Sequence, residues 1–134
     1  MVDKERMIYG IGTDVIETDR FKEKLNQNDE KLLNRLFSAR EIAYCRKGVQ
    51  VSAQARCFAA RFAAKESFMK ALGTGLRNGL RWTDIEIINN SLGKPLIQVY
   101  NKAHSTVKDK AIRNIHLSMS HARNHASALV ILEK

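Results

Sequence analysis

Four charged residues interrupt an apolar stretch near the middle of the 134-residue sequence. Residues 58–75 read FAARFAAKESFMKALGTG, with Arg61, Lys65, Glu66 and Lys70 among alanines and aromatic side chains. A carboxylate in apolar surroundings is costly unless a cation pairs with it or it binds a metal ion. Glu66 precedes Lys70 by four residues, and such pairs are common on helices and stabilise them slightly. Glu66 therefore belongs either to a structural ion pair or to a charged site.

A second carboxylate, Asp14, follows the apolar residues 7–12 near the start of the chain. Side chains at the end of a buried strand can face a cleft, so Asp14 could meet Glu66 there. An Asp and a Glu on separate elements suit a Mg²⁺ ion that keeps waters and borrows phosphate oxygens. Alternatively, Asp14 is a turn residue that accepts hydrogen bonds from the next backbone amides. The residues alone leave both interpretations open.

The overall charge favours an anionic partner. Lys and Arg number 23 against 14 Asp and Glu, which gives a formal net charge of +9. Such a surface attracts nucleic acid, anionic lipid, phosphorylated small molecules or acidic proteins, and composition does not choose among them.

Length and hydropathy predict one domain, residues 1–134, in the cytoplasm. The chain is long enough for a single core, and it has no apolar run that could span a bilayer. The charged start, MVDKERMIYG, lacks the pattern of a secretory signal. We therefore expect no membrane association, and we expect Cys45 and Cys57 to be reduced packing residues.

The charged residues must be positioned by a mixture of helices and strands, so we expect the α+β class. Gly73 should end the long helix in a left-handed cap, and Ser38 with Glu41 should cap an earlier helix. Residues 90–94 are rich in turn formers and predict a hairpin. We expect strands at 7–12, 81–89, 95–100, 115–119 and 125–133, and helices opening near residue 18, within 28–48, from about 52 to 72 and within 101–114.

The long helix should be buried on two faces. At 100° per residue, aromatic and large apolar side chains share one stripe with Lys65, whose head group we expect to reach solvent. Small residues share the opposite face, where another backbone could approach closely. The large side chains are Phe58, Phe62, Met69 and Leu72, and the small ones are Ala60, Ala64, Ser67 and Ala71.

Four motifs in order carry a family resemblance: GIGTDVIE at 10–17, RFAAKESFMKALGTG at 61–75, LGKP at 92–95 and HLSMSH at 116–121. Together they closely resemble the small class of 4′-phosphopantetheinyl transferases, the holo-acyl-carrier-protein synthases. The resemblance spans nearly the whole chain. It implies an antiparallel sheet packed against a long central helix, with one of the superfamily's two pseudo-repeats per chain.

The resemblance implies transfer of the phosphopantetheine arm of coenzyme A to a serine of apo acyl carrier protein. Asp14 and Glu66 then correspond to the ligands of a Mg²⁺ ion, with Mn²⁺ as a possible substitute. Lys70, one turn beyond Glu66, could reach the same diphosphate as a catalytic cation. The general base stays open. Ile16 stands where the larger members carry a second acid, which puts a third protein ligand in doubt.

The resemblance also implies a set of coenzyme-binding residues. Some have structural alternatives: Arg61 could form a salt bridge within the protein, Gly73 could serve first as the helix cap, and Lys94 could be an ordinary hairpin residue. The set comprises Arg61, Lys70, Gly73, Gly75, Lys94, Pro95 and His121.

The implied partner is an acidic acyl carrier protein bound by the helix after the first motif. Arg20 matches the family's basic position there, and Lys24 extends the charge. Members of the small class form homotrimers with sites between neighbours. We therefore expect that Asp14 and Glu66 need not meet the Lys94 or His121 of their own chain.

Two other functions compete with this hypothesis. A basic nucleic-acid-binding module would explain the charge, and residues 102–113 are rich in Lys and Arg. However, the aromatic residues follow core spacings rather than alternating with basic ones, and Asp14 and Glu66 would repel phosphate without a cation. A purely structural subunit predicts no metal dependence. We therefore expect no nucleic acid partner.

Overall fold

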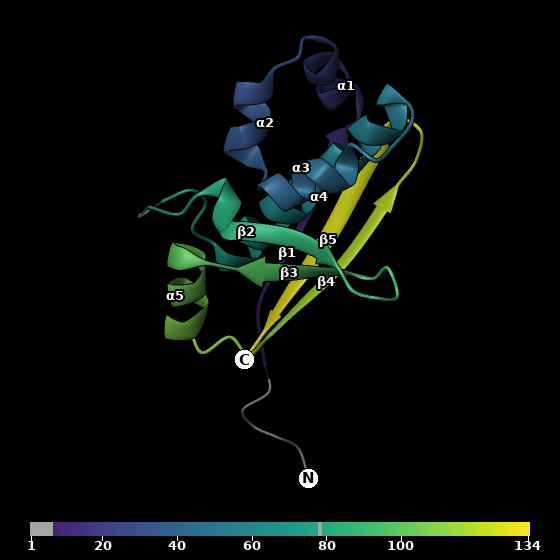
Figure 1. Ribbon diagram of the computed structural model, residues 1–134. Coiled ribbons are helices and arrows are strands. Elements are labelled where there is room, and N and C mark those ends of the chain that lie inside the picture. Colours follow the sequence, from purple (N-terminus) through teal and green to yellow (C-terminus); the bar gives the residue numbers. More distant parts are fainter. Residues whose placement is uncertain (1–6, 78) are drawn as a thin grey trace.

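The expected long helix forms as α4 (Val51–Leu72) and runs through the middle of the molecule (Figure 1). A computed structural model describes residues 7–77 and 79–134. The other elements are β1 (Ile8–Glu17), α1 (Asp19–Asn26), α2 (Glu30–Leu36), α3 (Ala39–Cys45), a 3₁₀ turn (Trp82–Asp84), β2 (Ile85–Asn89), β3 (Pro95–Val99), α5 (Asn101–Asp109), β4 (Asn114–His121) and β5 (His125–Glu133). The α+β class is confirmed.

Two antiparallel sheets accompany α4. The larger has the order β1-β5-β4, and the expected hairpin forms the second, β2-β3. Alternate residues of β5 are buried against α4 because successive side chains of a strand point to opposite faces. These buried residues are Ala126, Ala128, Val130 and Leu132.

Glycine lets β1 approach α4 closely. A Cβ atom built at Gly10 would lie 1.9 Å from the carbonyl oxygen of Ala71, and one at Gly12 would lie 1.8 Å from that of Ser67. Both contacts fall on the small-residue face of the helix. The expectation that another backbone lies against this face is confirmed.

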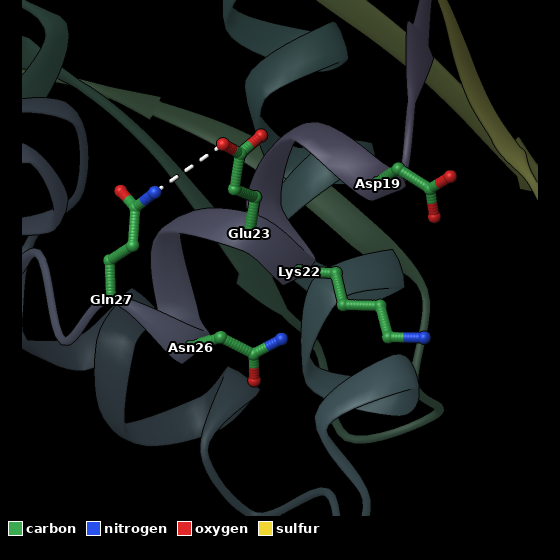
Figure 2. A pocket seen from close by; sticks show the side chains of 5 residues that line it. All are labelled: Asp19, Lys22, Glu23, Asn26 and Gln27. Atoms are coloured by element: carbon green, nitrogen blue, oxygen red, sulfur yellow. Dashed lines mark hydrogen bonds between the residues drawn. The ribbon is translucent and has the colours of Figure 1, made fainter.

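The start of α3 and the end of α4 have the caps that the sequence predicts. Ser38 Oγ accepts a hydrogen bond from the Glu41 amide, and Glu41 Oε1 accepts one from the Ser38 amide, which completes the capping box. Gly73 ends α4 with φ = 81°, in the left-handed region. The outer face of α1 is polar, and Gln27 Nε2 donates to Glu23 Oε1 there (Figure 2).

Two element boundaries differ from expectation. The first strand continues to Glu17, so Asp14 lies within β1 and not beyond its end. The cause is its pairing with β5, which continues as far as His125. The hairpin strand expected from residue 81 starts at Ile85, because residues 82–84 form the 3₁₀ turn.

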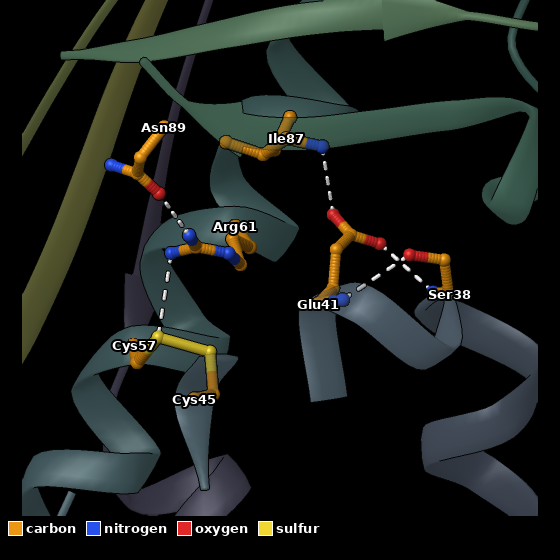
Figure 3. Close-up of a disulfide and its surroundings, with 7 residues drawn as sticks. All are labelled: Ser38, Glu41, Cys45, Cys57, Arg61, Ile87 and Asn89. Atoms are coloured by element: carbon orange, nitrogen blue, oxygen red, sulfur yellow. Dashed lines mark hydrogen bonds between the residues drawn. A yellow bond between two sulfur atoms is a disulfide. The ribbon is translucent and has the colours of Figure 1, made fainter. Parts of the chain in front are cut away.

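The expectation of two reduced thiols is wrong, because Cys45 and Cys57 form a disulfide (Figure 3). They lie at the end of α3 and in the second turn of α4, with their Cα atoms 5.4 Å apart. That separation is typical of a disulfide. The turn between the helices produces it, and a spacing of 12 residues does not reveal that turn.

No helix within residues 7–77 and 79–134 combines the length and hydropathy needed to cross a membrane. The charged segment on which the expectation about a secretory signal rests lies mostly outside the described residues.

Candidate active site

Asp14 of β1 and Glu66 of α4 face the same region between strand and helix. Asp14 is in register with Ala128, whose side chain is buried on the α4 side of the sheet, so Asp14 also points toward α4. Burial raises the pKa of Glu66, and the negative charge of Asp14 raises it further, while Lys70 and Arg20 act in the opposite direction. The structure therefore brings the two expected carboxylates into electrostatic contact.

Lys70 pairs with Asp14 rather than with Glu66 in the described part of the chain. Its Nζ atom lies 3.0 Å from Asp14 Oδ1 and donates to the carbonyl oxygen of Thr13, also at 3.0 Å. Asp14 Oδ2 is buried and has no hydrogen-bond partner among the described residues. Lys70 therefore neutralises Asp14 only in part and leaves one carboxylate oxygen without a partner.

The donor atoms of this cluster suit a hard divalent cation. Carboxylate oxygens are the ligands that Mg²⁺ prefers, and the unpaired Asp14 Oδ2 is costly to bury without a partner. No group of three or more His, Cys, Asp or Glu side chains that could hold a metal occurs among residues 7–77 and 79–134. A divalent cation at this place would therefore find two carboxylates, Asp14 and Glu66, among the described residues.

A cavity of about 480 Å³ lies beside Glu66 and Lys70. Gly73 and Gly75, two of the expected coenzyme-binding residues, line it together with Leu76 and Trp82. Both glycines have positive φ, 81° and 60°, and an added Cβ would meet no atom within 4 Å. Glycine is therefore favoured at these positions by backbone conformation and not by close packing.

The remaining coenzyme-binding candidates lie elsewhere. Arg61, Pro95 and His121 line a different cavity, of about 400 Å³. Arg61 precedes Lys70 by nine residues, which is about 13 Å along a helix axis. Lys94 lines neither cavity, and its backbone amide donates to Asn90 Oδ1 in the hairpin turn. A single chain thus divides the expected residues between two cavities.

Arg61 is only 3% exposed, and its partners are neutral. Nη2 donates to Asn89 Oδ1 at 2.7 Å and Nη1 to Cys57 Sγ at 3.3 Å (Figure 3). The guanidinium carbon lies 4.3 Å from the centre of the Tyr44 ring. Burial lowers the pKa of Arg61, although Glu41 and Tyr44 oppose this. The salt bridge considered for Arg61 is absent among the described residues, so no carboxylate there neutralises its charge directly.

Lys65 does not reach solvent, so that expectation is wrong. The side chain is fully buried, and its Nζ atom donates to Glu41 Oε1 at 2.7 Å. The same atom donates to the carbonyl oxygens of Leu36 and Trp82. Burial lowers the pKa of Lys65, and the Glu41 carboxylate partly offsets that effect. All three ammonium protons have acceptors, which identifies Lys65 as a structural residue.

The two expected partner-binding residues differ in position. Arg20 is exposed on α1, its guanidinium carbon lies 6.0 Å from the centre of the Phe62 ring, and its charge acts on Glu66. Lys24 lies one turn further along α1. Arg20 therefore flanks the carboxylate pair, and Lys24 extends positive charge away from it.

The sequence patterns did not point to several side chains that line the cavities. Trp82 and Leu76 lie beside Glu66, and Tyr44 and Arg56 lie beside Arg61. Trp82 is the only tryptophan of the sequence, and this was the one feature that could have identified any of these residues as part of a site. The other three occur in segments whose spacing is typical of ordinary helix and loop surfaces.

Comparison with known proteins relates nearly the whole chain to one protein family. A family model described as "4'-phosphopantetheinyl transferase superfamily" matches residues 10–130. Proteins named "Holo-[acyl-carrier-protein] synthase" are similar to this chain in Trichlorobacter lovleyi (49% identity, covering 95% of this chain and 98% of the relative) and Geotalea daltonii (47%, 96% and 100%). A crystal structure of a holo-(acyl-carrier-protein) synthase from Bacillus anthracis in complex with CoA (3',5'-ADP) aligns with a TM-score of 0.78, 34% identity and coverage of 96% and 98%.

Proposed function

Because this chain belongs to the 4′-phosphopantetheinyl transferase superfamily, we propose that it transfers the 4′-phosphopantetheine moiety of coenzyme A to a serine of apo acyl carrier protein. The shared name of relatives at 47% and 49% identity supports this activity, as does the likeness to a coenzyme-bound synthase structure. The products are the holo carrier protein and adenosine 3′,5′-bisphosphate. The enzyme is thus a transferase that serves fatty acid biosynthesis.

In this reaction the serine oxygen attacks the β-phosphorus, and the bond from that phosphorus to the bridging oxygen breaks. Asp14 and Glu66 would hold a Mg²⁺ ion, or Mn²⁺ in its place, which supplies charge neutralisation to the diphosphate. The observation that carries this assignment is the buried, unpaired Oδ2 of Asp14 beside a second carboxylate. Lys70 adds a mobile positive charge at the same place. The serine proton passes to a carboxylate or to water.

The enzyme works as a homotrimer with each site shared between neighbours. The division of the coenzyme-binding candidates between two cavities supports this arrangement. So does the outer face of the larger sheet, where Ile11 is 57%, Val15 61% and Leu129 41% exposed, because such apolar patches mark interfaces. The Arg61–His121 cavity of one chain would then complete the Asp14–Glu66 cluster of its neighbour.

Mixing two inactive variants tests the shared site. Glu66→Gln removes one half of the site and His121→Ala removes the other. If neighbours complete each other, mixed trimers regain activity, because some sites combine an intact half from each variant. Failure to regain activity in trimers shown to be mixed, by light scattering and mass spectrometry, would contradict sharing.

The positive charge has a function in binding the carrier protein. Arg20 and Lys24 on α1 contact the acidic partner, and complementary charge raises the association rate. Arg20→Ala should therefore raise KM for the carrier protein more than KM for coenzyme A. We place the enzyme in the cytoplasm. The positive charge that a nucleic-acid-binding module would explain is explained as well by an acidic carrier protein.

The direct test of the activity is mass spectrometry of apo acyl carrier protein incubated with this protein, coenzyme A and Mg²⁺. One phosphopantetheinyl group should be gained per carrier protein. Omission of Mg²⁺ with added chelator should stop the gain. Absence of any mass gain under the complete conditions would refute the proposed function.

A further inference from the structure

The cavity beside Glu66 and Lys70 adjoins a second cavity at Trp82. A neighbouring cavity of about 560 Å³ shares Leu76 and Trp82 with it and reaches Arg35 and Arg81. Because the two cavities have these side chains in common, they adjoin there, and we refer to them together as the extended groove. Its residues range from Glu66 and Lys70 at one end to Arg35, in the last turn of α2, at the other.

The far end of the extended groove is positively charged over an apolar floor. Leu80, which is buried, and Trp82 form the floor. Arg35 and Arg81 are exposed side chains that line the end. No carboxylate among residues 7–77 and 79–134 pairs with either guanidinium. Two guanidinium groups with no carboxylate partner in the described part of the chain therefore lie at this end of the extended groove.

The phosphopantetheine arm of the proposed substrate does not account for this charge. Beyond its phosphate the arm carries a hydroxyl, two amides and a thiol, all of them uncharged at neutral pH. At the reach per bond of an extended peptide, the arm spans about 15 Å from phosphorus to sulfur. If the arm lies over Trp82, its sulfur points away from the diphosphate and toward Arg35 and Arg81. An uncharged thiol is not a binding partner for their guanidinium groups.

A carboxylate at the end of an acyl group would supply the missing partner. Guanidinium groups bind carboxylates through paired, charge-assisted hydrogen bonds, and the neighbouring apolar floor suits the methylene groups of the acyl chain. We propose that Arg35 and Arg81 make this enzyme select acyl-coenzyme A substrates whose acyl group ends in a carboxylate. This inference rests on the proposed function and names a substrate class for it.

The chemical step is unchanged with such a substrate. The same phosphorus–oxygen bond breaks, the serine oxygen forms the same new bond, and the thioester stays intact. The product is therefore an acylated holo carrier protein, and no further reactant is required.

An acidic segment of the carrier protein is the rival occupant of Arg35 and Arg81. The small-molecule occupant is favoured because the guanidinium groups stand at the end of a concave, apolar-floored groove that continues from the reaction site. A docked protein would need neither the floor nor the connection to Glu66.

The test compares glutaryl-coenzyme A with 5-oxohexanoyl-coenzyme A, which replaces the terminal carboxylate by an uncharged acetyl group of equal size. Transfer to apo carrier protein is followed by mass spectrometry, and unsubstituted coenzyme A is run in parallel. We expect kcat/KM of the wild type to be about tenfold higher for the glutaryl substrate, a modest value for a charge-assisted contact at an exposed site. The double variant Arg35→Ala, Arg81→Ala should lower that ratio to about one. The double variant Lys102→Ala, Lys108→Ala, which removes two positive charges from α5, should keep the wild-type ratio.

Each other outcome overturns the inference in a distinct way. Equal kcat/KM for the two acyl substrates in the wild type refutes the selectivity. A ratio that persists in the double variant, together with a higher KM for the carrier protein, assigns the guanidinium groups to the protein partner. No transfer from unsubstituted coenzyme A in the wild type refutes the proposed function itself, and this inference with it.

Discussion

Lys65 and Glu66 are adjacent in the sequence, yet their surroundings on α4 are opposite in kind. Lys65 is fully buried and donates to three acceptors, one of them the Glu41 carboxylate. The negative charge of Asp14 acts on Glu66, and the ion pair of Lys70 is with Asp14. A buried charge with a complete set of partners stabilises the fold. An incomplete set indicates a site that a ligand completes.

The largest effect is expected when one of the two carboxylates, Glu66 or Asp14, loses its charge. Glu66→Gln and Asp14→Asn should each lower the transfer rate by roughly a thousandfold, because the proposed metal loses a charged ligand. Neither change should lower the free energy of unfolding, since each relieves repulsion between carboxylates. Activity and urea unfolding are measured on the same preparations. A loss of activity below tenfold in either variant would contradict the metal assignment.

Removal of the charge of Lys65, whose hydrogen-bond partners are complete, should destabilise the fold. Lys65→Met leaves Glu41 buried without its cation, which costs about 3–5 kcal/mol of unfolding free energy. Urea denaturation measures the loss. Lys70→Met is the control, because Lys70 is about half exposed and such pairs contribute at most about 1 kcal/mol. Equal destabilisation by the two variants would remove the distinction between the two charges.

The disulfide, like Lys65, is expected to stabilise the fold and to have no part in the reaction. It joins α3 to α4 across 12 residues, so the reduced chain should be less stable by about 3 kcal/mol from loop closure alone. Urea unfolding with and without dithiothreitol measures this difference. The variant Cys45→Ser, Cys57→Ser should show no response to the reductant. An equal response in both proteins would mean that the disulfide is not the cause.

Lys70 should matter for rate more than for stability. Lys70→Met should lower kcat/KM by about tenfold, through loss of one positive charge beside the diphosphate. It should also lower the Mg²⁺ concentration that gives half-maximal activity, because Asp14 then lacks a competing cation. Titration of activity against Mg²⁺ measures both effects. An increased Mg²⁺ requirement would show that Lys70 helps to hold the metal site together.

The smallest effect is expected from Glu86. Burial alone would raise the pKa of Glu86, but hydrogen bonds from Arg40, Ser38 and Tyr100 outweigh it, so the pKa is lowered from 4.5. The resulting stabilisation is present above pH 4.5 and is lost as the pH falls through the lowered pKa. Glu86→Gln should therefore reduce the slope of unfolding free energy against pH in that acidic range. An unchanged slope would show that other carboxyl groups account for it.

Local patterns in the sequence were enough to predict most of the fold. Gly73, the Ser38 capping box and the turn formers of residues 90–94 act within a few residues of themselves, so the sequence contains their signals. The length of β1 was missed because it depends on pairing with β5, more than 100 residues later.

The site was predictable in part for the same reason. The motifs identified Asp14 and Glu66, and the structure brings them into electrostatic contact. The burial of Lys65 was not predictable, because its carboxylate partner Glu41 is 24 residues away on another helix. The disulfide and the division of Arg61 and Gly73 between two cavities likewise follow from tertiary packing.

The two glycines of β1 determine how far apart the carboxylates can stand. With a methyl group at Gly12, the strand would have to retreat by at least about 1.6 Å to bring the 1.8 Å contact with the carbonyl oxygen of Ser67 to the 3.4 Å of ordinary van der Waals contact. Asp14, two residues along the same strand, would move away with it. Alanine at this position would therefore weaken binding of the proposed metal ion without altering either proposed ligand, an effect that inspection of Asp14 and Glu66 alone would overlook.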